Sequence, residues 1–307
     1  MTLALIAGQG GLPPHLVDVL RARGEVPLIC ETEQHPSDVT ALVPRLRFRL
    51  EELGTLLELL RDMGVGRLCM AGAMRRPPVD PARIDAATLP LVPRVQAALA
   101  QGDDATLRAF VAIFEEAGLH VVGAAELDPA LLPGAGVQAA VPADDVEAEI
   151  ALATAALDDM AKADLGQAVV VCATRVIARE QDSGTDAMLA GLIPDRDAGP
   201  EVTADPLGAV GHMLDNVADW LGGPAAEAAR RTLPAQGGLL YKAPKPGQEL
   251  RVDMPVIGPD TVMHAAAAGL RGIVIEQGGV MVMDAKRVHD MLDRAGLFLL
   301  VRPRTTG

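Results

Sequence analysis

The sequence predicts an α/β protein of two α/β domains, the first Rossmann-like with a mostly parallel sheet, and a ligand cleft between them. Three observations support this fold class. The chain opens on an apolar run, a glycine turn and a helical pattern, which is how an α/β unit begins. Short apolar runs then alternate with amphipathic helical stretches to residue 122, and the alternation returns after residue 239. Half of the 307 residues are hydrophobic, as a core-forming chain requires.

The first domain, residues 1–132, is predicted element by element from this alternation. Its strands are short apolar runs, and its helices repeat leucines at helical spacing, as Leu53, Leu56 and Leu60 do. Because helices separate the strands, we expect a mostly parallel sheet covered on both faces. The expected strands are 3–7, 26–30, 68–71 and 120–122, and the expected helices are 12–20, 50–63, 88–100 and 103–117.

A linker at residues 133–143 is predicted from its prolines and glycines. The C-terminal α/β catalytic domain, residues 144–307, follows and starts with an acidic helical turn, which the helix dipole favours. We expect apolar runs at 168–173 and 175–178, strands at 239–241, 272–275, 280–283 and 298–301, and helices at 260–268 and 285–294.

An insertion rich in proline and glycine interrupts this second domain at about 194–234. Its one amphipathic stretch carries Trp220 on the apolar face. Asp215 and Asp219 lie on the polar side, where a membrane-surface helix would carry Lys and Arg. We therefore expect a packed helix there and no membrane anchor.

Composition excludes several classes of function. The 27 Lys and Arg stand against 41 Asp and Glu, for a net charge of −14, and only 2% of residues are aromatic, so we expect no nucleic-acid partner. The histidines lack zinc-enzyme spacing, and neither a Walker loop nor a G-x-S-x-G elbow occurs. Three further features predict a cytoplasmic protein. The three cysteines include no C-x-x-C pair, the N-terminus lacks the basic region of a signal peptide, and no apolar run is long enough to span a membrane.

The glycine turn of Gly8, Gln9, Gly10 and Gly11 stands where a dinucleotide-binding fingerprint would begin. The third glycine of G-x-G-x-x-G is replaced by Pro13, but free amides at the start of the following helix still favour an anion. Glu31 lies about where a ribose-binding acid is expected. A tight strand-to-helix turn without a ligand explains the same pattern, and both interpretations stay open.

The segment 241–255 concentrates three cations, Lys242, Lys245 and Arg251, in an acidic chain. Two prolines hold the loop extended, and this concentration of positive charge suits a pyrophosphate. If residues 250–254 are extended, Arg251 and Asp253 project to the same side, which places a phosphate clamp beside a carboxylate able to bind a divalent metal. A solvated surface loop with ordinary ion pairs is the alternative.

Two weaker candidates stand at predicted helix starts. The first pairs Asp103 with Asp104 after a glycine, and the second is a run of Gly184, Thr185 and Asp186. Helix capping alone explains most such occurrences, although phosphoryl chemistry with two metals gathers carboxylates from separate loops in this way.

At these same segments the chain resembles the LpxI family, the UDP-2,3-diacylglucosamine pyrophosphatases of lipid A biosynthesis. The resemblance implies a two-domain cytosolic enzyme that uses Mg²⁺ to hydrolyse the pyrophosphate of UDP-2,3-diacylglucosamine to UMP and 2,3-diacylglucosamine 1-phosphate (lipid X). It also implies that the lipid lies between the domains and that Asp253 is catalytically essential. The matching segments occur in family order at 5–13, 102–104, 184–189, 242–246, 251–255 and 268–274, whereas 194–234 is longer than the family pattern requires.

Residue patterns and resemblance together give a working hypothesis. Lys242, Lys245 and Arg251 neutralise the pyrophosphate, and Asp253 holds Mg²⁺ or orients the attacking water. Partner carboxylates come from Asp103, Asp104 or Asp186, and the glycine turn binds one end of the substrate. The hypothesis also includes a homodimer and a transient contact of the protein with the cytosolic face of the inner membrane. The alternatives are a dinucleotide-binding oxidoreductase and a noncatalytic nucleotide- or lipid-binding protein.

Overall fold

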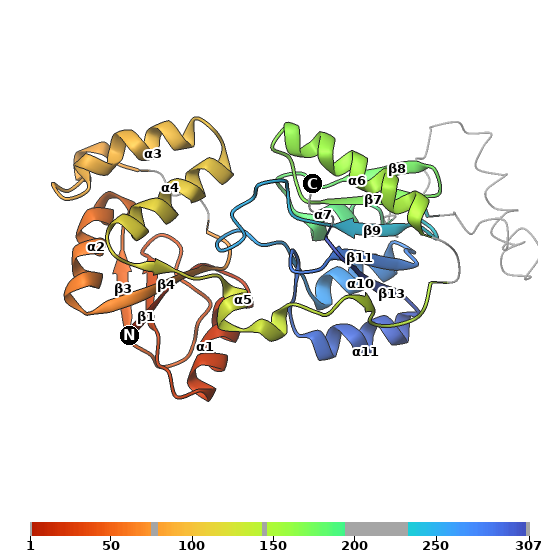
Figure 1. Cartoon of the computed structure of the whole chain (residues 1–307), viewed down its shortest axis with the longest axis horizontal. Helices are drawn as coiled ribbons and strands as arrows, with labels where there is room; N and C mark the ends of the chain where they lie inside the picture. The colour runs from red at the N-terminus through yellow and green to blue at the C-terminus, as the bar shows by residue number, and fades with distance from the viewer. Residues whose placement is uncertain (1, 75–78, 143–145, 194–232, 305–307) are drawn as a thin grey trace, which may run out of the picture.

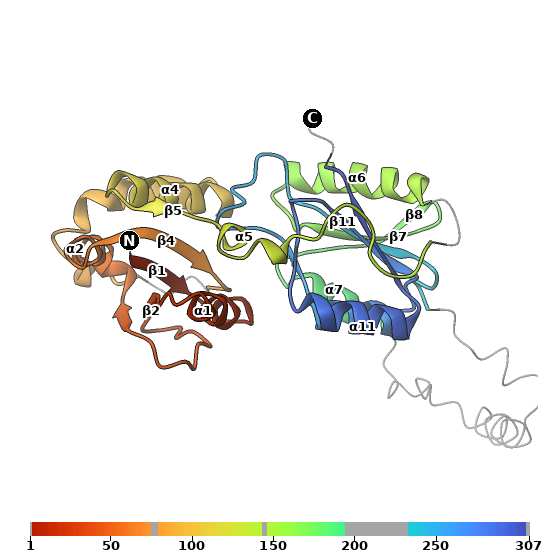
Figure 2. The same cartoon turned by 60° about the horizontal axis from the view of Figure 1, so that its bottom comes forward.

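The computed structural model describes residues 2–74, 79–142, 146–193 and 233–304. Two α/β bodies stand side by side, and a loop of the C-terminal half reaches toward the N-terminal one (Figure 1). In each, a sheet lies between two layers of helices (Figure 2). The predicted insertion at about 194–234, with its amphipathic stretch around Trp220, lies almost entirely outside the described residues, as do residues 143–145.

The first sheet is parallel throughout and has the strand order β3-β2-β1-β4-β5. The order reverses between β1 and β4, which is the switch point where open α/β sheets bind ligands at the carboxyl ends of their strands. The α/β prediction is therefore confirmed, with one strand missed. The strands are β1 (Thr2–Ala7), β2 (Leu28–Thr32), β3 (Arg45–Phe48), β4 (Val65–Ala71) and β5 (His120–Val121).

Helices cover both faces of this sheet because each buries one apolar stripe. Leu16 and Leu20 of α1 pack on one face together with α5, and Leu56 of α2 and Phe114 of α4 pack on the other. Helix α3 packs against α4. The helices are α1 (Leu12–Ala22), α2 (Leu53–Asp62), α3 (Val92–Leu99), α4 (Asp103–Glu116) and α5 (Ala124–Leu127).

The second sheet is mixed, with the order β6-β13-β11-β9-β7-β8. Strands β9, β11 and β13 run parallel to one another, whereas β6, β7 and β8 each pair antiparallel. Strand β6 lies within the predicted linker and pairs with β13. The strands are β6 (Gly136–Val137), β7 (Ala168–Cys172), β8 (Arg175–Arg179), β9 (Leu239–Lys242), β11 (Gly272–Glu276) and β13 (Phe298–Arg302).

The helices of the second body divide in the same way between the two faces of its sheet. Ile150 and Met160 of α6 pack on one face, and Val262 of α10 and Val288 of α11 pack on the other. These helices are α6 (Glu147–Lys162), α7 (Thr185–Ala190), α10 (Pro259–Ala267) and α11 (Ala285–Ala295). Within the described ranges, no helix is long and apolar enough to cross a membrane.

A separate two-stranded parallel sheet joins the two bodies. It pairs β10 (Val256–Ile257) with β12 (Met281–Val282). The expected strand at 280–283 therefore does not belong to the main sheet. Met281 is buried in the core of the first body, among residues of β1 and α1, whereas Val282 next to it is buried in the second. The C-terminal half thus completes the hydrophobic core of the N-terminal half.

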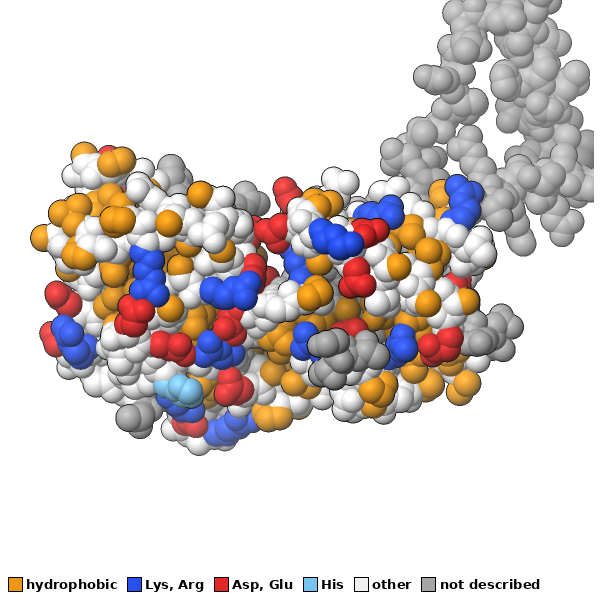
Figure 3. All heavy atoms as spheres, turned by 45° about the horizontal axis from the view of Figure 1, so that its top comes forward, with side chains coloured by type: hydrophobic (Ala, Val, Ile, Leu, Met, Phe, Trp, Pro, Cys, Tyr) orange, Lys and Arg blue, Asp and Glu red, His pale blue; other side chains and the backbone are white. Residues whose placement is uncertain are grey.

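Charged side chains of both signs are interspersed on the face shown in Figure 3. Most of the described arginines contribute to ion pairs with neighbouring carboxylates, so the net charge of −14 does not produce one uniform acidic surface there. Such pairs fix local geometry and add little to stability when they are exposed.

Candidate active site

Two adjoining cavities lie at the carboxyl ends of β1 and β4, at the switch point of the first sheet. We call them the apolar cavity, of about 390 Å³, and the glycine-turn cavity, of about 330 Å³. Met70, Gly72, Val252 and Asp253 line both. Residues of the first sheet and of the C-terminal loop 250–256 therefore form one continuous site.

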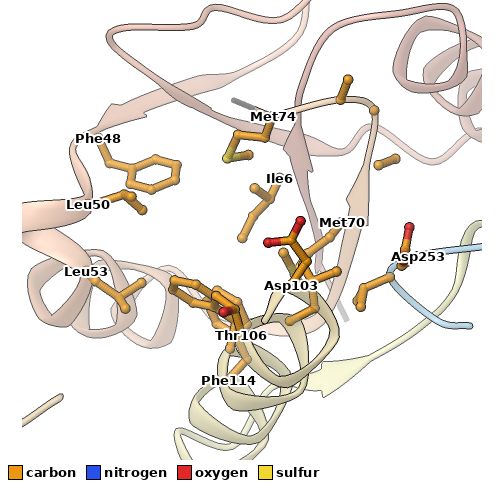
Figure 4. Close-up of a pocket in the computed structure, with 16 residues that line it drawn as sticks. Ile6, Phe48, Leu50, Leu53, Met70, Met74, Asp103, Thr106, Phe114 and Asp253 are labelled. Atoms are coloured by element: carbon orange, nitrogen blue, oxygen red, sulfur yellow. The ribbon is translucent and has the colours of Figure 1, made fainter. Parts of the chain in front are cut away.

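The apolar cavity is walled by aromatic and aliphatic side chains of the N-terminal half. Phe48 and Leu50 line it from the end of β3, and Phe114 lines it from α4. In Figure 4, Phe48 and Leu50 lie across this cavity from two carboxylates that line it, Asp103 and Asp253. The arrangement suits a ligand with an apolar part and an anionic part.

Asp253 lies on the wall that the two cavities share. The side-chain amide of Gln248 donates from Nε2 to Asp253 Oδ2 at 2.5 Å and to the Asp253 backbone oxygen at 2.6 Å. The side-chain oxygen of the same glutamine accepts from the Lys245 backbone N–H at 2.8 Å. Gln248 therefore holds the carboxylate in one orientation, and it is a residue that the sequence argument missed although it lies inside the cation-rich loop.

The glycine turn forms one wall of its cavity. Gly8 donates to the Ala71 backbone oxygen at 2.8 Å, and Gln9 and Ala73 exchange backbone hydrogen bonds, so the turn is fastened to the end of β4. A Cβ at position 8 would lie 2.3 Å from the Ala73 oxygen, which explains the glycine there. The Gly10 N–H donates to Asp38 Oδ2 at 2.6 Å, so a carboxylate already binds this turn at a helix N-terminus.

Glu31, the proposed ribose acid, is instead a structural group. It is 1% exposed, and its carboxylate accepts from the Ser37 amide and hydroxyl, from Arg45 and from Arg47. Burial acts to raise the pKa of Glu31, but the hydrogen bonds of Ser37 and Arg47 and the charge of Arg45 outweigh it, and the pKa is lowered. Both carboxylate oxygens are engaged in the joint between β2 and β3.

Arg251 lines the glycine-turn cavity and bridges the two bodies. Its guanidinium donates to Glu249 at 2.9 and 2.7 Å and to Glu115 Oε1 of α4 at 2.6 Å. These carboxylates, Glu249 foremost, raise the pKa of Arg251. Arg108 of α4 donates to the Gly247 oxygen at 3.0 Å and adds a second link between α4 and this loop. Arg251 is thus positioned beside Asp253 but is shared between two carboxylates.

Two predicted site residues, Lys245 and Asp104, lie in a different cavity of about 720 Å³ between α4 and α6. Lys245 Nζ pairs with Asp164 Oδ1 at 2.7 Å, and Asp104 forms an ion pair with Arg108. Asp104 Oδ1 also accepts from the Glu249 amide at 3.3 Å. The structure therefore separates these two residues from the cavities that Asp253 lines.

The remaining candidates, Gly184, Thr185, Asp186 and Lys242, belong to the second body, where Thr185 and Lys242 are buried and Asp186 is exposed. Lys242 is 7% exposed, and its Nζ donates to Thr185 Oγ1 at 2.7 Å. Asp186 Oδ1 accepts from Thr261 Oγ1 at 3.0 Å. Gly184, with φ +86°, ends the loop before α7. None of the four lines the cavities of Asp253, but the charge of Asp253 acts to raise the pKa of Lys242.

Carboxylates from both bodies are the side chains that could hold a metal ion at this site. Within the described residues, no three His, Cys, Asp or Glu side chains gather into a metal-binding group. Mg²⁺ commonly needs only one or two protein carboxylates, because waters and substrate phosphates complete its shell. Asp103 and Asp253, which line one cavity, fit that requirement better than Asp104 does.

Comparison with known proteins identifies relatives of the whole chain. The family model of the LpxI N-terminal domain matches residues 2–131, and that of the LpxI C-terminal domain matches residues 134–199 and 220–300. A Caulobacter vibrioides protein named UDP-2,3-diacylglucosamine pyrophosphatase LpxI is 34% identical over 299 residues, which cover 97% of this chain and 96% of that protein.

Proposed function

Because this chain belongs to the LpxI family, we propose that it hydrolyses the pyrophosphate bond of UDP-2,3-diacylglucosamine to UMP and 2,3-diacylglucosamine 1-phosphate (lipid X). The reaction would be Mg²⁺-dependent and would serve lipid A biosynthesis. The relative's name supports the substrate, and the described site supports the chemistry.

The position of Asp253 is the observation that carries this proposal. The carboxylate lines both the glycine-turn cavity and the apolar cavity. In the substrate, the pyrophosphate lies between a nucleoside and a diacylated sugar. A substrate placed with its nucleotide end at the glycine turn and its acyl chains at the apolar cavity brings the scissile bond to Asp253.

The apolar cavity is suited to acyl chains. Its volume of about 390 Å³ falls within the roughly 300–1,000 Å³ range of small-molecule sites, and its walls are mainly Phe, Leu, Ile and Met. A sugar carrying acyl chains needs such a wall, because apolar surface left in water would weaken binding.

The chain's own residues would perform distinct tasks in the reaction. Gln248 fixes the Asp253 carboxylate, so little reorganisation is needed when substrate binds. Arg251 can offer a planar pair of N–H donors to a phosphate if its bond to Glu115 is exchanged. Asp103 and Asp253 would hold Mg²⁺, which supplies a bound water of lowered pKa and neutralises phosphate charge.

The oxidoreductase alternative is less well supported by this site. Pro13 replaces the third glycine of the dinucleotide fingerprint, and Glu31 is committed to Ser37, Arg45 and Arg47. A noncatalytic lipid carrier would need the apolar cavity but would not need Asp253 held beside it. We further propose a cytoplasmic location with transient contact at the cytosolic membrane face, where a diacylated substrate resides.

The test is UMP release from UDP-2,3-diacylglucosamine by the purified protein, with and without Mg²⁺. We expect metal-dependent release in the wild type and a loss of about 10²–10³-fold or more in kcat for Asp253→Asn, with substrate binding largely retained. Asp290→Asn, on the exposed side of α11, is the matched control and should behave like the wild type. Near-normal turnover by Asp253→Asn would overturn the assignment.

A further inference from the structure

A buried lysine in the second body belongs to a hydrogen-bonded chain of three side chains. Lys242, the last residue of β9, donates from Nζ to Thr185 Oγ1 at 2.7 Å. Thr185 donates in turn to Glu180 Oε1 at 2.6 Å, and Glu180 Oε2 accepts from the Gln167 amide at 2.6 Å. Lys242, Thr185 and Glu180 are 7%, 6% and 7% exposed.

The direction of these hydrogen bonds is fixed. A threonine hydroxyl has one proton, and Thr185 gives it to the Glu180 carboxylate, so the hydroxyl oxygen must accept from Lys242. Glu180 is itself immobilised by the Gln167 amide and by burial. The position of the ammonium group is therefore set by a residue, Glu180, that does not touch it.

A purely structural buried lysine would be expected to pair directly with a carboxylate, because burying an unpaired charge is costly. Among the described residues, however, Lys242 forms no ion pair within 4 Å, and its hydrogen-bond partner is a neutral hydroxyl. An ammonium group has three N–H donors, so within the part of the chain that the structure describes this arrangement leaves donor capacity uncommitted.

Carboxylates approach Lys242 from three elements. Glu180 follows β8, Asp186 lies on α7, and Asp253 lies in the loop that lines both cavities. Burial lowers the pKa of Lys242, and the charges of Glu180, Asp186 and Asp253 oppose that shift. The ammonium group is therefore electrostatically coupled to the carboxylate at the centre of the site.

We propose that Glu180 and Thr185 are positioning residues that hold the Lys242 ammonium as a fixed positive charge for the site that Asp253 lines. The proposal rests on the proposed function. Hydrolysis of a pyrophosphate develops negative charge on the leaving phosphate, and a preorganised cation in a buried site stabilises that charge without reorganising. It also changes the interpretation of Thr185, which would be a link between Glu180 and Lys242 and not a substrate ligand.

The test compares three variants in the UMP-release assay at saturating Mg²⁺. Thr185→Val removes the hydroxyl at nearly constant shape, and we expect kcat to fall about tenfold or more with KM within threefold of wild type. Thr185→Ser restores the hydroxyl and should recover kcat to within about threefold. Thr154→Val, which removes a hydroxyl that donates to the Ile150 backbone oxygen and lies beside Tyr241, outside the chain of Lys242, Thr185 and Glu180, is the control and should keep wild-type kcat.

A second measurement separates positioning from folding. Glu180→Gln removes a charge that favours the protonated lysine, so the pKa of Lys242 should fall further and the alkaline limb of the kcat profile should move to lower pH. A network that only supports the fold would lower the unfolding temperature and leave both kcat at low temperature and that limb unchanged, which would overturn the proposal. Wild-type protein that releases no UMP would refute the proposed function itself, whereas an active wild type with an unaffected Thr185→Val variant would refute only this inference.

Discussion

Glu31→Gln tests whether the buried carboxylate of β2 is a structural group or a ligand group. The substitution keeps the shape of the side chain and removes its charge from between Arg45 and Arg47. Breaking a buried ion pair by removing one partner can cost about 3–5 kcal/mol. Arg47 is two-thirds exposed, however, with 66% of its side-chain surface accessible, and solvent screens that pair.

We therefore expect Glu31→Gln to lower the free energy of unfolding by about 2 kcal/mol at pH 7. For a chain of this size, that corresponds to a decrease of roughly 4–8 °C in Tm by differential scanning calorimetry. The KM for UDP-2,3-diacylglucosamine at 25 °C should stay within about twofold of wild type, because both Glu31 oxygens already bind protein groups.

The loss should also depend on pH. The folded pKa of Glu31 lies below its ordinary value of 4.5, so its stabilising contribution is fully present above pH 4.5 and disappears as pH falls through the folded pKa. The difference in Tm between wild type and Glu31→Gln should therefore shrink in scans below pH 4.5. An unchanged Tm at pH 7, or a tenfold rise in KM at normal Tm, would refute the structural interpretation.

Three further substitutions test other parts of the site. Gly8→Ala places a Cβ 2.3 Å from a backbone oxygen and should cost about 1–3 kcal/mol in thermal unfolding, whereas Gly11→Ala, with open space around it, should cost less. Glu115→Gln releases Arg251 from its contact across the two bodies, so the guanidinium is free to bind a substrate phosphate and KM should fall. Because the ion pair is partly exposed, we expect a decrease of up to about fivefold, and a rise in KM would contradict the phosphate role of Arg251. Leu50→Glu puts a carboxylate into the apolar cavity and should raise KM for the diacylated substrate about tenfold, with unchanged KM arguing against acyl binding there.

The main elements of the fold were predictable because their apolar patterns are strong. The opening strand, the glycine turn and α1 follow directly from residues 3–20. Strand β3 was missed because its charged residues, Arg45 and Arg47, interrupt the apolar pattern, and their carboxylate partner lies on the neighbouring strand. A short segment that alternates arginines with apolar residues identifies a strand only when the neighbouring strand that it pairs with is known.

The joining sheet was predicted only in part. The expected strand at 280–283 contains β12, but its partner β10 has two residues, too few for any periodicity, and β12 packs against the core of the other body. Similarly, β6 occupies a segment whose prolines and glycines indicated a linker. Contacts between residues far apart in sequence decide these elements.

The candidate site was predicted as a set of residues but not as an arrangement. Spacing and charge singled out Asp253, Arg251 and the glycine turn, and the structure brings them to one cavity. It moves Lys245 and Asp104 to another cavity and buries Lys242, because whether a cation faces solvent, a carboxylate or a hydroxyl depends on tertiary packing. The roles assigned to these residues stay predictions.

Met281 also has a consequence for synthesis on the ribosome. The strands of the first sheet are complete at Val121, yet the core they enclose lacks Met281 until about 160 more residues have been added. At about 5–20 residues per second, the nascent N-terminal half would wait roughly ten to thirty seconds with part of its apolar surface uncovered. A chain released before that point would keep the exposed surface by which chaperones and proteases recognise incomplete products. The joining sheet therefore makes native burial of the first core conditional on nearly complete translation.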